Sequence, residues 1–192
     1  MTDTAFQPTT FPGMTVQYAH DLYGPAMATL SDDGVYRYTL TRTIDIGSTP
    51  RRSDVVWIML NPSTADAMAD DQTIRRCTGF SRRWDAGVMH VVNLYALRAT
   101  HPDELTHRPH PVGRYNDQVI DATLCDAHKP FVVAAWGAHP MGTRRARSVL
   151  ERVTRRHRVH CLGRTLLGQP SHPLRLSYDT QVEILRPKQE AS

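Results

Sequence analysis

Four short polar segments carry the side chains that could do chemistry, and each lies at or just beyond the end of an apolar stretch. They contain amides, hydroxyls, guanidinium groups and imidazoles, the groups from which catalytic and base-recognition sites are built. A site collected from them would use Asn61, Pro62, Ser63 and Thr64; Asn93 and Arg98; Gly137 and His139; and His172, Pro173 and Arg175.

The apolar stretches predict the strands that would position these side chains. The strongest is 55–60, an unbroken apolar run typical of a strand buried on both faces. We expect further strands at 34–44 (half exposed), 89–97, 131–136, 159–162 and 182–185, and helices at 65–84, 103–107, 116–128 and 143–156. This alternation predicts an α/β fold with three α/β/α layers and a mostly parallel central sheet of about four to five strands. The carboxyl ends of parallel strands meet at one edge, so the polar segments should line one crevice.

An acidic cluster follows the first polar segment. Pro62 cannot donate to a sheet ladder, and Ser63 or Thr64 can cap a helix, so a helix should begin there. Asp66 and Asp70 would then lie one turn apart on that helix, with Asp71 adjacent. Such carboxylates could bind Mg²⁺ or activate water, or they could simply stabilise the helix start through its dipole and an ion pair.

Length and composition fit one globular domain. The chain has 192 residues, of which 40% are hydrophobic and 22% charged. We expect a loose N-terminal segment at 1–14 and a single α/β domain at 15–192. The sequence shows neither a signal peptide nor an apolar run of membrane-spanning length, so we expect a cytoplasmic protein without membrane partners. Its three cysteines are widely spaced, so we expect neither disulfides nor a zinc site.

The charge balance permits an anionic partner. The formal net charge is +4, and most of the positive charge comes from arginine. These arginines could contact DNA or a nucleotide, or they could form solvated helix surface, and composition does not separate the two. Nor does it predict an oligomeric state.

Several of these motifs resemble a known family. MLNPSTADAMADDQTIRRC, VVNLYALRAT, VVAAWGAHP and SHPLRL resemble the bacterial and phage family known as domain of unknown function 1643, over roughly residues 36–176. That family name implies no activity.

A more distant resemblance concerns the uracil-DNA glycosylase superfamily. Residues 60–63 are similar to the first motif of the mismatch-directed enzymes, of GINPG type, and residues 172–177 to the HPSPLS-type second motif. The chain departs from that pattern at Ser63, which replaces Gly, and at Arg175, which replaces Pro. The segment 64–71 has no counterpart there.

The resemblance implies a hydrolase that cleaves the N-glycosidic bond of a non-standard or modified base. It implies that Asn61 holds the attacking water, that His172 donates to the departing base, and that the backbone after Pro173 either grips a phosphate or wedges a strand. Asn93 has an amide that can pair in two ways with a base edge. A base in a duplex would have to be flipped out to reach the site. No cofactor is expected on this interpretation.

Other interpretations stay open. Asn61 could only cap a helix, Trp136 could be core, and His139 could be a surface residue. Two other functions fit the sequence: a non-glycosylase enzyme that modifies a base with Asp66, Asp70, Asp71 and Mg²⁺, or a non-catalytic module that binds a nucleotide or nucleic acid. The chain has no P-loop, GxGxxG, HExxH or GxSxG motif, which disfavours the enzyme classes they mark.

Overall fold

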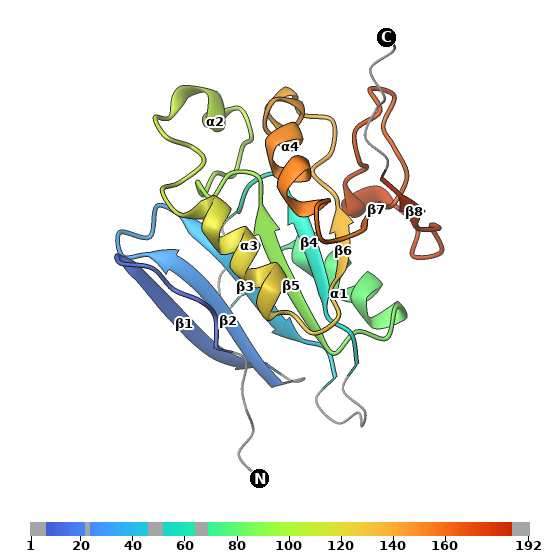
Figure 1. Ribbon diagram of the computed structural model, residues 1–192, viewed down its shortest axis with the longest axis horizontal. Coiled ribbons are helices and arrows are strands. Elements are labelled where there is room, and N and C mark those ends of the chain that lie inside the picture. Colours follow the sequence, from blue (N-terminus) through green and yellow to red (C-terminus); the bar gives the residue numbers. More distant parts are fainter. Residues whose placement is uncertain (1–6, 22–23, 46–51, 64–68, 186–192) are drawn as a thin grey trace.

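One eight-stranded sheet forms the centre of the protein. The structure is a computed structural model that describes residues 7–21, 24–45, 52–63 and 69–185. The strand order is β1-β2-β3-β5-β4-β6-β7-β8 (Figure 1). The strands are β1 (Met14–Asp21), β2 (Gly24–Ser31), β3 (Arg37–Thr43), β4 (Val55–Met59), β5 (Val88–Asn93), β6 (Phe131–Ala134), β7 (Val159–Cys161) and β8 (Glu183–Ile184).

Helices cover both faces of the sheet. They are α1 (Gln72–Arg83), α2 (Glu104–His107), α3 (Asn116–Asp126) and α4 (Pro140–Val153), with a 3₁₀ turn, η1 (Pro173–Arg175). In Figure 1, α3 and α4 lie in front of the sheet and α1 lies behind it. The cores agree with this view, because one apolar cluster joins the sheet to α3 and α4 and another joins it to α1.

The predicted apolar run becomes the central strand. All five residues of β4 are buried, and the strand pairs in parallel with β5 on one side and β6 on the other. Trp57 lies against α1, where it packs on Phe80 and Trp84 with ring centroids 6.1 and 5.4 Å away. Ile74, Cys77 and Phe80 recur at every third position of the sequence, which predicts one apolar helix face, and all three are buried.

The predicted sheet is wrong. Strands β5, β4, β6 and β7 run parallel to one another, but the other four neighbouring pairs are antiparallel, so the sheet is mixed and larger than four to five strands. This overturns the expected mostly parallel, uracil-DNA glycosylase-like architecture. The reason lies in short connections: two residues join β1 to β2 and five join β2 to β3, too few for the crossover that parallel strands require.

Strand β3 is not half exposed, as its alternating sequence predicts, because it pairs with β2 and β5 inside the sheet. Every residue of β3 is buried, including Arg37 and Arg42. The strand therefore carries two guanidinium groups into the interior, where each needs compensating partners.

The first helix also begins later than predicted. Residues 69–71 are not helical, and α1 starts at Gln72. Its cap is Asp71, whose Oδ1 accepts from the Ile74 N–H at 2.7 Å. Asp70 thus lies outside the helix.

None of the helices within the described ranges combines the length and apolarity needed to cross a membrane. The cytoplasmic location and the division at residue 15 stay predictions.

Candidate functional site

A cavity of about 330 Å³ opens where β4, β5 and β6 end, beside the start of α1. We call it the main cavity. Its volume is at the lower end of the roughly 300–1,000 Å³ found for small-ligand sites. Residues from all four predicted segments line it, together with one predicted aspartate: Asn61, Ser63, Asp71, Asn93, Gly137, His139 and His172.

Asn93 supplies the most unusual feature of this cavity. It is the last residue of β5 and is only 1% exposed. Its Nδ2 and Oδ1 atoms are both buried, and neither has a hydrogen-bond partner among the described residues. Buried amides are nearly always hydrogen-bonded, so a paired donor and acceptor left open at a cavity wall suit a ligand that completes both bonds.

The backbone around Asn93 is held from the opposite face of the sheet. Asn116 of α3 donates its Nδ2 to the Asn93 and Leu94 carbonyls at 2.9 and 3.2 Å. Arg145 of α4 donates its Nε to the Leu94 carbonyl at 3.3 Å. Because these bonds fix the strand end, the Asn93 amide is presented to the cavity from a rigid position.

Arg37 is a cavity residue that sequence reasoning missed. It lies in β3, which the sequence does not place next to β5, and it lines the main cavity while only 2% exposed. An arginine in a buried strand is unusual and could have indicated this residue. The sequence pattern, however, predicts a half-exposed strand, in which an arginine is ordinary. A guanidinium at this depth makes the cavity favourable for oxygen atoms that carry negative charge.

Asn61 has a definite structural role. Its Nδ2 donates to the carbonyls of Pro62 and Ala99, at 3.0 and 2.8 Å. The Ala99 N–H in turn donates to the Pro62 carbonyl at 2.9 Å. The side chain therefore ties the loop after β4 to the loop after β5. Its donors are used, which leaves Oδ1, with no partner among the described residues, as the atom available to a ligand or a water.

His172 lies at the start of η1 with a defined tautomer. Its Nδ1 accepts from the Leu174 N–H at 3.3 Å, so the neutral ring carries its proton on Nε2. Burial lowers the pKa of His172 below its ordinary value, although the nearby Asp71 carboxylate partly opposes this effect. The ring is thus neutral at neutral pH, with its Nε2–H as the remaining donor.

Gly137 and His139 have supporting roles at the same edge. Gly137 has φ of +77°, and a Cβ there would lie 3.4 Å from the His172 Cβ. His139 accepts at Nδ1 from the Met141 N–H as the cap of α4, and its Nε2 lies 3.1 Å from an Asp103 carboxylate oxygen. Both ring nitrogens of His139 therefore have protein partners.

Asp70 and Asp71 both have structural partners. Asp71 caps α1 and accepts a short hydrogen bond from the Ser63 hydroxyl. Asp70 accepts from Nε and Nη2 of Arg42, at 2.9 and 2.7 Å. Within the described ranges no group of three or more His, Cys, Asp or Glu residues could hold a metal ion. Asp66 and Thr64 lie outside the described residues.

Removing the Asp70 carboxylate is expected to destabilise the protein. Arg42 is only 4% exposed and would lose the ion pair with Asp70. We expect Asp70→Ala to lower the free energy of unfolding by about 2–3 kcal/mol, less than the roughly 3–5 kcal/mol of a fully buried pair because Asp70 is partly exposed. Urea unfolding measures the change. Asp179→Ala, which removes the exposed Arg83–Asp179 pair, is the control and should cost less than about 1 kcal/mol. Equal effects of the two variants would contradict the assignment.

The remaining predicted residues do not line the main cavity. Pro62 and Pro173 are buried at the loop starts, and Arg175 is exposed on η1. Arg98 lines a neighbouring cavity instead. Nothing in the described structure brings Arg175 to the site.

Comparison with known proteins gives one match. Residues 37–174 match the model of a family described as protein of unknown function (DUF1643). No curated protein and no solved structure matches the chain.

Proposed function

Because the chain belongs to the DUF1643 family, whose description states no activity, we propose a function from the site itself: the main cavity binds a nucleobase, and the protein hydrolyses its N-glycosidic bond. The substrate is a nucleotide or a nucleotide unit of DNA.

The observation that carries this proposal is the amide of Asn93, which has no hydrogen-bond partner among the described residues. Leaving a buried polar group without a hydrogen bond costs about 1–3 kcal/mol, and Asn93 has two such atoms. A ligand that offers a donor and an acceptor side by side recovers this cost. The edges of nucleobases have that pattern, and side-chain amides recognise them by paired hydrogen bonds.

Two further groups favour cleavage of the bond over simple binding. When the bond between sugar and base breaks, its electron pair moves to the base, so negative charge develops on the base. The Nε2–H of neutral His172 can donate to a base oxygen, and the Arg37 guanidinium lines the same cavity. Fixed donors and charges in a cavity with little water stabilise such developing charge strongly.

Asn61 is the candidate to hold the attacking water. Its Nδ2 bonds to two backbone carbonyls leave Oδ1 as an acceptor for a water hydrogen. An amide cannot take the proton as a base would, so its contribution is positioning. The water oxygen bonds to the sugar carbon as the bond to the base breaks. The proton that the water loses passes to solvent, and the departing base takes up a proton.

The test is release of a free base. Wild-type protein is incubated with single- and double-stranded oligonucleotides that carry uracil, mismatched thymine or hypermodified bases, and with the corresponding free nucleotides. We expect free base and abasic sites from at least one substrate, and loss of both in Asn61→Ala. Nucleotide binding without base release from any substrate would reject the hydrolase and leave a binding module.

A further inference from the structure

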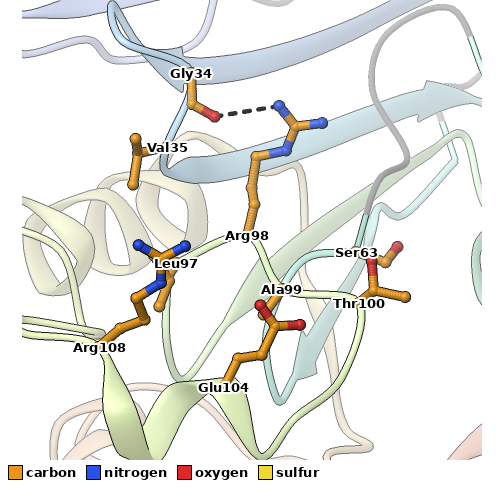
Figure 2. A pocket seen from close by; sticks show the side chains of 9 residues that line it. All are labelled: Gly34, Val35, Ser63, Leu97, Arg98, Ala99, Thr100, Glu104 and Arg108. Carbon is orange, nitrogen blue, oxygen red and sulfur yellow. Dashed lines mark hydrogen bonds between the residues drawn. The ribbon is translucent and has the colours of Figure 1, made fainter.

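A second cavity lies next to the main cavity and shares a wall with it. It measures about 300 Å³, and the shared residues are Ser63, Ala99 and Thr100. Figure 2 shows two arginines from different segments: Arg98 extends from the loop after β5 toward the Gly34 carbonyl, and Arg108 comes from the end of α2. We call it the arginine cavity.

We propose that the arginine cavity binds a phosphate group of the molecule whose base occupies the main cavity. The substrate is then a nucleotide, free or within a strand, and not a free base or a nucleoside. This inference rests on the proposed function for the occupant of the main cavity, but the phosphate site itself can be tested alone.

Arg108 is the main reason for this proposal. Its side chain is exposed and forms no hydrogen bond or ion pair with the described residues, although Glu104 precedes it by four residues and lines the same cavity. The Arg98 guanidinium, in contrast, is oriented by a 3.2 Å bond from Nη1 to the Gly34 carbonyl. Guanidinium groups bind phosphate oxygens through short, charge-assisted hydrogen bonds.

Glu104 reduces the positive charge of the cavity without neutralising it. Its Oε1 accepts from the His101 N–H at 3.0 Å, so the carboxylate is held by the start of its own helix. Among the described residues that line the cavity, two guanidinium groups and one carboxylate leave an excess positive charge. Removing the carboxylate charge should therefore strengthen phosphate binding, whereas removing the Arg108 charge should weaken it.

The shared wall is rigid enough to fix the relation between the two cavities. The Ala99 N–H donates to the Pro62 carbonyl and the Ala99 carbonyl accepts from Asn61, at 2.9 and 2.8 Å. The neighbouring Thr100 is exposed and can offer its hydroxyl to a ligand. Base and phosphate of one nucleotide would thus lie on the two sides of a wall that hydrogen bonds hold in place.

The experiment titrates the whole protein by calorimetry with inorganic phosphate, deoxynucleosides, their 5′-monophosphates and a short single-stranded oligonucleotide. We expect Arg108→Gln to weaken inorganic phosphate about tenfold and Glu104→Gln to strengthen it roughly threefold. Arg158→Gln, which removes an equal charge from an exposed side chain directly before β7, is the control and should change phosphate binding little. Asn93→Leu should lose the base contribution while phosphate still binds.

The outcomes separate the two proposals. If Arg108→Gln weakens the monophosphates together with inorganic phosphate, the source is a free nucleotide; if it weakens the oligonucleotide and inorganic phosphate but not the monophosphates, the source is a strand phosphodiester. Phosphate binding that follows these charges without any base binding or release would reject the proposed function and keep the phosphate site. No phosphate binding by the wild type, or equal binding by wild type and Arg108→Gln, overturns the phosphate site, even if free base is released.

Discussion

Asn93→Leu is expected to make the protein more stable while it abolishes base binding. The substitution removes two buried polar atoms that lack partners among the described residues, and each such atom costs about 1–3 kcal/mol. Leucine is larger than asparagine, but the side chain borders a cavity that can take the extra volume. We therefore expect the free energy of unfolding to rise by about 1–3 kcal/mol and base release to fall below detection. Urea unfolding and an assay of released base measure the two effects.

Asn116→Leu is the control, because we expect it to change the free energy of unfolding in the opposite direction. The Asn116 amide donates to two backbone carbonyls, so Asn116→Leu removes one donor from each of them, and the Leu94 carbonyl keeps a second donor, Arg145 Nε. This variant should lower the free energy of unfolding by about 1–3 kcal/mol. The role assigned to Asn93 would be refuted if Asn93→Leu destabilised the protein as Asn116→Leu does, or if it kept full base release. A gain in stability at the cost of activity is the expected signature of a functional polar group.

His172→Ala is expected to lower kcat by about 10²–10³-fold, the usual loss when one donor to a developing negative charge is removed. The expected change in KM is smaller, since the bond to the base oxygen strengthens only as charge develops. Steady-state kinetics of base release separate the two parameters. His157→Gln is the control, because His157 follows the far end of α4, whose 14 residues put it about 20 Å from the cavity end of that helix. An equal loss of kcat in both variants would argue against a role for His172.

The same histidine predicts a pH dependence. Burial lowers the pKa of folded His172 below the ordinary value of 6.5, whereas the unfolded chain titrates near that value. As the pH falls below 6.5, the unfolded state takes up the proton first, so the free energy of unfolding decreases until the folded ring is protonated as well. The protonated ring can no longer accept from Leu174. We expect kcat to be constant at neutral pH and to fall only below pH 6.5. We also expect His172→Gln to remove the part of the decrease in the free energy of unfolding at acidic pH that this histidine causes. A fall in activity that begins well above pH 6.5 would contradict a lowered pKa.

The sequence by itself determined the parallel centre of the sheet and the polar residues at its edge. Apolar runs such as 55–60 can only be buried, and a run that stops at Asn61 or Asn93 must place a polar group where the strand leaves the core. Local patterning also located the buried face of α1. These features depend on residues that are neighbours in the chain, so periodicity and turn chemistry suffice to predict them.

Only the tertiary structure decided what surrounds that edge. Strand β3 pairs with β5 in antiparallel orientation, which places Arg37 in the wall of the main cavity. Arg42 of the same strand pairs with Asp70, 28 residues away. Helix α1 begins at Gln72 with Asp71 as its cap, although Ser63 and Thr64 were equally good caps by sequence. Strand partners, ion pairs and the choice among caps depend on contacts between distant segments. Their energies are set by burial and geometry, which a local sequence pattern does not contain.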